Sequence, residues 1–350
     1  MTTRRFPPSS PAPSLVVGVD AGGTTTRALV TTLDGVPLGE ARAGGANPNA
    51  HGPERAAEQL TEAIGSALDR AGPTARGSVV AAVVGLAGVS LLRDDTIREH
   101  MGDALVKAGL NPGGDEFVGD DEVAFASGTP EPHGTVLIAG TGAIATRIEG
   151  RRRVRTADGM GWLIGDEGSA FWIGHQAARE TARQMSLGGE LSPLARAVAK
   201  RVVPGRRPTG EYRPEEHARD FARTLTAAPP IGLAEFAPLV TEAHRQGDPS
   251  AEVIVNAAAG HLAQSVHQVR VPGERLPVVL AGGVLIRSAP IREALTHKLT
   301  LGTGAPVLRA GRTEGAAAWL AAVNAGVDGD DPALHAAFTG ADPAAPSVPA

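Results

Sequence analysis

Cysteine is absent from the 350 residues of the chain. Its absence excludes a disulfide framework, a cysteine-ligated zinc site, an iron–sulfur cluster and a thiol nucleophile. Lysine occurs only three times, never after glycine and never before serine or threonine, which excludes a Walker phosphate-binding loop. The net charge of −5 shows no basic excess. We therefore expect neither nucleic acid nor an anionic membrane to be a main partner.

Long apolar runs are missing as well. The uncharged run at residues 77–92 is too short, and too rich in glycine and alanine, to cross a bilayer. Residues 1–14 contain two arginines with no apolar stretch behind them, and they predict a disordered tail rather than a signal peptide. A hydrophobic fraction of 42% is enough for a sizeable core. These features predict a soluble, cytoplasmic protein of two domains or one large one.

One pattern of elements occurs twice along the chain. An apolar strand at 15–20 is followed by a Gly/Thr turn and two further strands, and the same order restarts with the strand at 135–140. This repetition predicts a duplicated α/β fold. We expect an N-terminal lobe over 15–128, a C-terminal lobe over 129–325 and a C-terminal tail over 326–350. Further expected elements are helices at 53–71, 94–108 and 314–324 and strands at 78–88 and 277–283.

The first Gly/Thr turn follows a buried strand that ends in Asp20. The adjacent Gly22 and Gly23 allow the backbone to approach an anion and point N–H groups at it. The hydroxyls of Thr24 and Thr25 add neutral donors. Asp20 is placed to hold Mg²⁺ through water. The alternative is an ordinary glycine-rich hairpin.

The second turn contains Gly140, Thr141 and Gly142. The segment GTGAIA matches the dinucleotide pattern G-x-G-x-x-A, so a Rossmann oxidoreductase that uses NAD is an alternative. In that fold the glycines open a helix, whereas the residues that follow here predict a β-hairpin. The hairpin favours a second phosphate-binding turn.

Three further segments carry polar groups at the ends of strands or the starts of helices. Residues 161–172, GWLIGDEGSAFW, can present Asp166 and Glu167 to a polyol, or can simply begin a capped helix. Gly282 and Gly283 after a strand offer a flat surface for a purine, or form a strand-to-helix turn. A carboxylate of the pair at 120–121 can take a proton from a hydroxyl, or can cap a helix.

Together these segments resemble a known superfamily. VGVDAGGTTTRALV and LIAGTGAIA resemble the two phosphate loops of the sugar kinase/Hsp70/actin fold, and VVLAGGVLI resembles its adenosine segment. The segment GWLIGDEGSAFWIGHQA closely resembles the N-acetylglucosamine kinase branch of the BadF/BadG/BcrA/BcrD ATPase family. The resemblance covers residues 15–325. It implies a two-lobed actin-like (duplicated ribonuclease H-like) fold, with ATP, Mg²⁺ and a small-molecule sugar in the cleft between the lobes.

The resemblance also implies roles for individual residues. Asp120 aligns best with the catalytic base, and Asp121 is the alternative, because a gapless count to GTG favours it. Asn47 and Asp166 match sugar-binding residues, and Asp120 would hold the sugar hydroxyl. Thr141 and Gly142 would touch both phosphate and sugar, while Gly282 and Gly283 would touch the nucleoside.

The implied reaction is phosphorylation of the 6-hydroxyl of an amino sugar, N-acetylglucosamine above all. Family members often carry Ser-Asn after GTG, where this chain has Ala143 and Ile144, so glucosamine or another hexose is an alternative substrate. A non-catalytic sugar sensor is another alternative. Activators of 2-hydroxyacyl-CoA dehydratases and zinc-containing ROK kinases need cysteines that this chain lacks. A homodimer is the assembly that the family implies.

Overall fold

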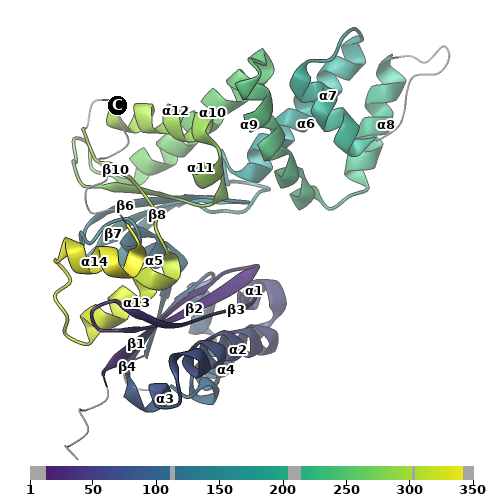
Figure 1. Cartoon of the computed structure of the whole chain (residues 1–350). Coiled ribbons are helices and arrows are strands. Elements are labelled where there is room, and N and C mark those ends of the chain that lie inside the picture. The colour runs from purple at the N-terminus through teal and green to yellow at the C-terminus, as the bar shows by residue number, and fades with distance from the viewer. Residues whose placement is uncertain (1–12, 111–114, 204–213, 302–303, 342–350) are drawn as a thin grey trace, which may run out of the picture. The chain divides into compact units, whose positions relative to one another are not determined.

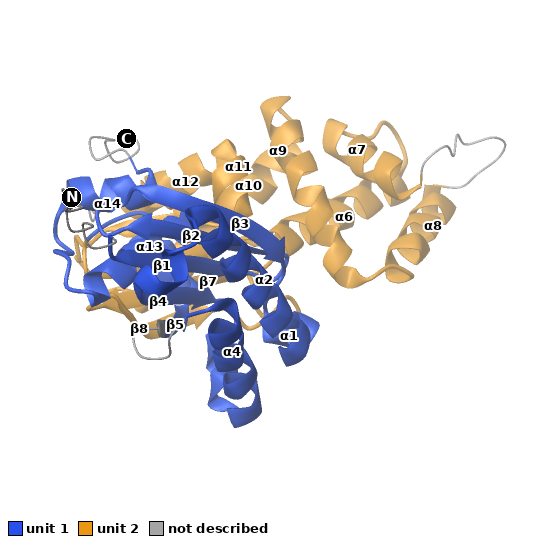
Figure 2. Ribbon diagram, turned by 60° about the horizontal axis from the view of Figure 1, so that its bottom comes forward, with its two compact units in different colours: residues 1–130, 311–345 blue, residues 131–310, 346–350 orange. Residues whose placement is uncertain are grey.

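The computed structural model describes residues 13–110, 115–203, 214–301 and 304–341. These residues form two compact units (Figure 2). Unit 1 contains the described residues up to Pro130 and those from Gly311 onward, and unit 2 contains Glu131–Ala310. The predicted N-terminal tail falls outside the described residues over 1–12.

Unit 1 is built around a five-stranded sheet in the order β3-β2-β1-β4-β5 (Figure 1). Strands β1, β2 and β3 are antiparallel neighbours, whereas β4 and β5 run parallel to β1. Its elements are β1 (Leu15–Ala21), β2 (Thr25–Thr32), β3 (Pro37–Gly44), α1 (Pro48–His51), α2 (Pro53–Ala71), α3 (Ala75–Ser78), β4 (Val79–Leu86), the 3-10 helix η1 (Val89–Arg93), α4 (Asp95–Ala108), β5 (Asp115–Gly119), α5 (Asp120–Ala126), α13 (Thr313–Asn324) and α14 (Pro332–Thr339).

Both faces of this sheet are covered, because alternate side chains of a strand point to opposite faces. Val17 and Val19 of β1 pack into a core with α2 and α4. Val16, which immediately precedes Val17, packs on the other face with Trp319 of α13 and Phe338 of α14. A strand covered on both faces is apolar throughout, which is why the almost uninterrupted apolar runs at 15–20 and 78–88 predict central strands.

Helix α13 lies directly against β1. A Cβ atom at Gly18 would lie 2.1 Å from the backbone nitrogen of Ala318 and 2.2 Å from the carbonyl oxygen of Glu314, so only glycine permits this approach. The structure therefore assigns residues 311–325 to unit 1, whereas we expected them in a C-terminal lobe ending at 325. The expected tail over 326–350 also differs in its described part, because α14 is a helix whose Phe338 is buried in unit 1.

Unit 2 repeats the same sheet topology, in the order β8-β7-β6-β9-β10, with β6, β7 and β8 antiparallel and β9 and β10 parallel to β6. Helices α10 and α12 pack on one another above this sheet, and α6 to α9 extend the helical layer (Figure 1). The elements are β6 (Gly134–Ala139), β7 (Ala143–Glu149), β8 (Arg152–Asp158), α6 (Ala170–Leu187), α7 (Pro193–Val202), α8 (Pro214–Thr226), the 3-10 helix η2 (Pro230–Phe236), α9 (Ala237–Arg245), α10 (Pro249–Val269), β9 (Val278–Ala281), α11 (Gly283–Arg287), α12 (Ala289–Thr300) and β10 (Val307–Arg309).

The matching strand orders confirm the predicted α/β fold with a duplicated sheet. In the part of the chain that the structure describes, no helix combines the length and apolar character needed to cross a membrane.

Candidate functional site

The carboxyl ends of three parallel strands meet at one edge of the sheet of unit 1. Ala21 of β1 pairs with Leu86 of β4, and Leu86 pairs with Gly119 of β5. Asp20 precedes the first of these ends and Asp120 follows the last. Since ligands of open α/β sheets bind outside the carboxyl ends of the strands, this edge is the candidate site of unit 1.

Asp120 is the first residue of α5, with Gly119 as N-cap. Burial raises the pKa of its carboxyl to about 6, and the nearby charges of Asp121 and Asp20 add to the rise. Such a pKa lies close to the working pH of a general base.

Asp121, the alternative base, has a different environment. Its side chain is only 2% exposed, and its Oδ1 accepts a hydrogen bond of 3.0 Å from the backbone N–H of Glu122. That bond uses the carboxylate to order the first turn of α5. The Asp120 carboxylate also accepts backbone hydrogen bonds, but Asp120 is the more exposed of the two residues, which favours Asp120 over Asp121 as the group that meets a substrate.

Asp20 is held from two sides. Its Oδ2 accepts a hydrogen bond of 2.6 Å from Oγ1 of Thr313 and lies 3.3 Å from the guanidinium of Arg27. Burial raises the pKa of Asp20, while Thr313 and Arg27 act to lower the pKa. Both contacts use Oδ2, which leaves Oδ1 for a metal-bound water.

The donor set around Asp20 suits one kind of metal. No cluster of three or more His, Asp or Glu side chains in metal-binding geometry occurs among the described residues. Mg²⁺ in kinases keeps several waters and is bound by one or two carboxylates together with substrate phosphates. A lone carboxylate such as Asp20 fits a magnesium ion that arrives with a nucleotide.

The first Gly/Thr turn is braced by its own backbone. The N–H of Gly22 donates to the carbonyl of Thr25 (3.1 Å), and the carbonyl of Gly22 accepts from Ala46 (3.1 Å). Gly23 and Thr24 form the exposed tip, while Thr25 is half-buried at the start of β2. The turn thus has a rigid base and an exposed tip, as anion binding requires.

Asn47 also lies at this edge. It caps α1, with its Oδ1 accepting a hydrogen bond of 2.8 Å from the N–H of Asn49. A Cβ atom at Gly88, which follows β4, would lie 3.4 Å from the same oxygen. The side chain is half-buried beside the end of β4.

In unit 2 the second turn is tied to the start of α6. The N–H groups of Ala170 and Phe171 donate to the carbonyls of Gly140 (2.8 Å) and Thr141 (3.3 Å). Gly142 contacts Asp166 so closely that a Cβ atom on this glycine would lie 2.6 Å from the Asp166 Oδ2. The structure therefore brings the predicted Thr141, Gly142 and Asp166 together.

Asp166 adopts φ +59°, a left-handed conformation that is uncommon outside glycine. The residue as a whole is 9% exposed. Burial and the charge of Asp158 raise its pKa, and hydrogen bonds from the N–H groups of Ala143 and Gly161 act to lower the pKa.

Asp158 is a residue that sequence reasoning missed. Its Oδ1 accepts a hydrogen bond from the N–H of Asp166 (2.6 Å), and its Oδ2 accepts one from the N–H of Glu167 (2.9 Å). The Asp-Gly step at 158–159 predicts only the end of a strand. In the structure its carboxylate holds the GDEG segment in place.

Glu167 contacts helix α10. Its Oε2 is 3.5 Å from Nδ1 of His261, and the ring of His261 packs edge-on against Trp172 at 4.9 Å. The side chain of Glu167 is 47% exposed. This pairing gives Glu167 a partner on α10, and its predicted contact with a sugar stays a prediction.

A cavity of about 710 Å³ is lined by two segments predicted to hold a nucleotide, the second Gly/Thr turn and the glycine pair after β9. Thr141 lines it from the second turn and Gly283 from the start of α11. Gly282, which precedes Gly283, abuts the carbonyl of Ala139 at the end of β6. The remaining walls of the cavity come from the second turn, α6, η2, α9, α11 and α12 and are formed by Gly140, Ala170, Ile173, Ala234, Glu235, Ala237, Pro238, Thr241, Glu242, Arg245, Val284, Arg287, Ser288 and Ile291.

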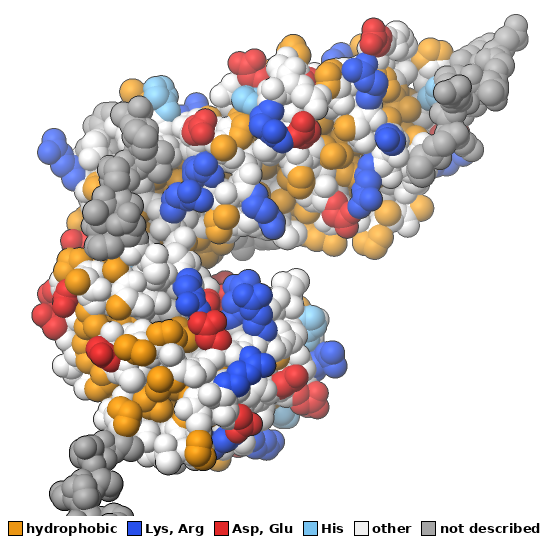
Figure 3. All heavy atoms as spheres, in the orientation of Figure 1, with side chains coloured by type: hydrophobic (Ala, Val, Ile, Leu, Met, Phe, Trp, Pro, Cys, Tyr) orange, Lys and Arg blue, Asp and Glu red, His pale blue; other side chains and the backbone are white. Residues whose placement is uncertain are grey.

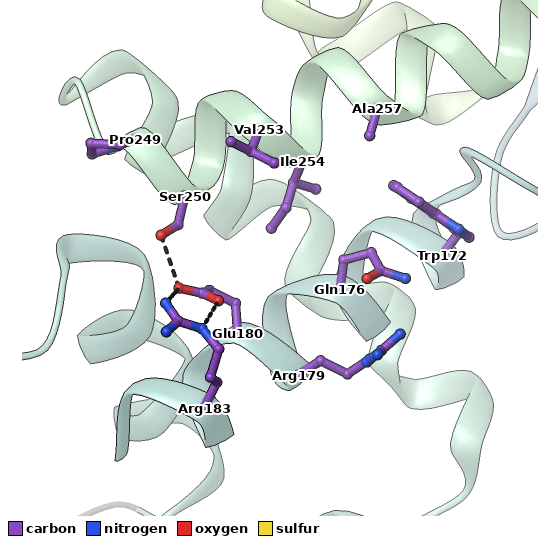
Figure 4. Close-up of a pocket in the computed structure, with 10 residues that line it drawn as sticks. All are labelled: Trp172, Gln176, Arg179, Glu180, Arg183, Pro249, Ser250, Val253, Ile254 and Ala257. Atoms are coloured by element: carbon purple, nitrogen blue, oxygen red, sulfur yellow. Dashed lines mark hydrogen bonds and ion pairs between the residues drawn. The ribbon is translucent and has the colours of Figure 1, made fainter. Parts of the chain in front are cut away.

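A second cavity of unit 2, about 700 Å³, lies between α6 and α10 and contains none of the predicted residues (Figure 4). At one end Glu180 binds Arg183 through both carboxylate oxygens, at 2.7 Å each, and Ser250 at 3.1 Å. These bonds lower the pKa of Glu180 to about 2. The network ties α6 to α10.

Comparison with known proteins identifies the family. A sequence profile of the BadF/BadG/BcrA/BcrD ATPase family matches residues 17–301. The chain belongs to this family.

Two curated proteins are similar to this chain. An N-acetylmuramic acid/N-acetylglucosamine kinase of Clostridium acetobutylicum is 32% identical over 179 residues, which span 51% of this chain and 57% of that protein. An N-acetyl-D-glucosamine kinase of Dictyostelium discoideum is 23% identical over 297 residues, 81% of this chain and 90% of that protein.

Two solved structures have an architecture similar to that of this chain. A Chromobacterium violaceum protein with the provisional name N-acetylglucosamine kinase matches with a TM-score of 0.66 and 25% identity, over 89% of this chain and all of that one. A ROK family glucokinase from Streptomyces griseus, in complex with glucose and AMPPNP, matches with a TM-score of 0.52 and 20% identity, over 89% and 98% of the two chains. The second likeness concerns the fold alone.

Proposed function

We propose that this family member is a sugar kinase that transfers the γ-phosphoryl group of ATP to the 6-hydroxyl of N-acetylglucosamine. The names of the two curated relatives support this substrate. The match to the clostridial kinase spans just over half of that protein's length. The observation that carries the proposal is Asp120, a half-buried carboxylate whose pKa is raised to about 6 at the carboxyl edge of a sheet.

Asp120 would act as the general base. Its carboxylate accepts a hydrogen bond from the sugar 6-hydroxyl and takes the proton as that oxygen bonds to the γ-phosphorus. The bond from the γ-phosphorus to the bridging oxygen breaks, and ADP leaves. Phosphoryl transfer demands little covalent chemistry from the protein beyond positioning and charge neutralisation.

The nucleotide ligands that the family resemblance implies include residues of unit 2 and residues of unit 1. The cavity behind Thr141 and Gly283 accepts the nucleoside, with the apolar walls of Ala234, Pro238 and Ile291 beside the base. The tips of the two Gly/Thr turns donate N–H groups to the phosphates. Asp20 would hold Mg²⁺ through a water molecule, and the ion would supply charge neutralisation on those phosphates.

Asn47 and Asp166 are the proposed sugar ligands, with Thr141 and Gly142 beside Asp166. The two residues after GTG, Ala143 and Ile144, offer no polar side chain to an N-acetyl group. Ala143 is buried, and its backbone N–H donates a hydrogen bond to the carboxyl of Asp166. The side chain of Ile144 packs on Gly159. A Cβ atom added to Gly159 would lie 2.8 Å from Cδ1 of Ile144. Glucosamine or a plain hexose is therefore the second candidate substrate.

The test is ADP release by the purified protein with Mg-ATP and one sugar at a time: N-acetylglucosamine, glucosamine, N-acetylmannosamine, N-acetylmuramic acid, glucose, or none. We expect N-acetylglucosamine to have the highest kcat/KM. A preference for glucosamine or glucose would retain the kinase and transfer the specificity to the second candidate. Sugar-independent hydrolysis, or no ADP release, would contradict the proposal and favour a non-catalytic sensor.

Two further properties belong to the proposal. We propose a homodimer, as the family resemblance implies, which light scattering of the full chain would test. We also propose a cytoplasmic location, because the reaction consumes ATP.

A further inference from the structure

Three charged residues stand in a row across the sheet of unit 1. Asp20 of β1 is the register partner of Arg27 of β2, and Arg27 is the register partner of Arg42 of β3. Residues paired in register on neighbouring strands share a face. Two arginines directly opposite one another repel, which destabilises a sheet unless an anion lies near them.

The nearby carboxylates pair with Arg27 and Arg312 but not with Arg42 or Arg70. Asp20 pairs with Arg27 at 3.3 Å, whereas Glu40 (2.6 Å) and Glu314 (3.0 Å) both pair with Arg312. Arg70 donates to the backbone carbonyl of Glu40, a neutral acceptor. Among the described residues, no carboxylate lies within ion-pair distance of Arg42 or Arg70.

These side chains line a single cavity of about 650 Å³, here called the arginine cavity. Its wall is formed by Arg27, Ala28, Glu40, Ala41, Arg42, Arg70, Gly311, Arg312, Thr313 and Glu314. The space-filling view shows basic and acidic side chains gathered on the face of unit 1 over β2 and β3 (Figure 3). Four guanidinium groups stand against the carboxylates of Glu40 and Glu314 in the wall and of Asp20 beside Arg27, so the wall keeps a net positive charge.

We propose that the arginine cavity is an anion-binding site for a phosphoryl group, carried either by a phosphate monoester or by inorganic phosphate. Guanidinium groups present planar, paired N–H donors that match phosphate oxygens and bind them in bidentate fashion. A dianion between Arg42 and Arg27 would neutralise the repulsion across β2 and β3, which a single carboxylate would do only in part.

The site is separate from the residues proposed for catalysis, but it is linked to one of them. Arg27 contacts Asp20, so an anion in the cavity would compete with Asp20 for the same guanidinium. This connection offers a route by which phosphate concentration could influence Asp20. Binding itself does not depend on kinase activity, so its test stands apart from that of the proposed function.

The experiment is calorimetric titration of the full chain with inorganic phosphate at constant ionic strength, repeated with saturating Mg-AMPPNP to fill the nucleotide site. The test variant is Arg42→Ala, and the matched control is Arg55→Ala, an exposed arginine of the same unit on α2. We expect saturable binding that persists with AMPPNP, weakens at least tenfold in Arg42→Ala and is unchanged in Arg55→Ala. No saturable binding, loss with AMPPNP, or equal binding in Arg42→Ala and wild type would overturn the site.

Thermal unfolding gives a second readout that guards against a misfolded variant. Without phosphate, Arg42→Ala should melt at or above the wild-type temperature, because the mutation removes a like-charge pair. With phosphate, only the wild type and Arg55→Ala should gain stability. A phosphate-induced gain in Arg42→Ala equal to that of wild type would contradict the site.

A parallel titration with glycerol 3-phosphate, a monoester that is not the product of the proposed reaction, identifies the source. Tighter binding than phosphate indicates a phosphate monoester, and equal binding indicates the free ion.

Discussion

The raised pKa of Asp120 leads to a quantitative pH dependence. If Asp120 accepts the proton of the substrate, only its ionised form is active. With a pKa of about 6, about 99% of the carboxyl is ionised at pH 8, about half at pH 6 and about 9% at pH 5. We therefore expect kcat/KM to fall about elevenfold between pH 8 and pH 5.

The cause of the raised pKa of Asp120 can be tested separately from the size of the rise. The charge of Asp121 contributes to the raised pKa, after burial. Asp121→Asn keeps an oxygen that can accept from the N–H of Glu122 but removes that charge, so the acid limb should move to lower pH. Phosphate groups of the nucleotide titrate in the same range, and they do so equally in both proteins, so the difference between the two profiles isolates Asp120.

The assay is coupled ADP release at limiting sugar and saturating Mg-ATP from pH 4.5 to 8.5, with circular dichroism to verify folding at each pH. A wild-type limb with a midpoint below pH 5 would refute the reasoning. An unchanged midpoint in Asp121→Asn would refute the assigned charge effect. Lost activity in Asp121→Asn with retained activity in Asp120→Asn would transfer the role of base to Asp121.

Three other substitutions test the positions of residues. Gly142→Ala places a Cβ atom 2.6 Å from Oδ2 of Asp166, so KM for the sugar should rise at least tenfold in steady-state assays. Asp158→Ala leaves two N–H groups without their acceptor and should cost about 1–3 kcal/mol by denaturant unfolding and raise KM for the sugar, with Asp158→Asn retaining part of both; an unaltered KM would contradict the positioning role. Gly18→Ala would bring a Cβ atom to 2.1 Å from the backbone of α13 and should cost about 1–3 kcal/mol or more, whereas the control Gly65→Ala, with open space on α2, should be neutral or stabilising.

Much of the fold is predictable from the sequence because its signals are local. The helix at 53–71 begins at a proline and ends before Gly72, with Leu60, Ile64 and Leu68 at helical spacing, and the structure has α2 over Pro53–Ala71. Both Gly/Thr turns lie between apolar strands, so their hairpins and the duplicated sheet follow from neighbouring residues. Such patterns need no knowledge of distant parts of the chain.

The unpredicted features depend on long-range contacts. The hydroxyl of Thr313 reaches Asp20 across 293 positions of sequence, and α13 joins unit 1 because Gly18 allows it to approach β1. Neither contact leaves a local pattern. The choice between Asp120 and Asp121 depended on which residue of the first turn of α5 faces the interior, and a seven-residue helix is too short for periodicity to decide this.

The most direct test of the central claim compares wild type with Asp120→Asn in forming sugar phosphate from N-acetylglucosamine and Mg-ATP, with the product identified by mass spectrometry. A general base contributes about 10²–10⁴-fold to a rate, so the account predicts a loss of kcat of that size, with nucleotide and sugar binding retained. Asp120→Asn with a kcat within threefold of wild type would contradict the account, as would a wild-type protein that forms no phosphorylated sugar.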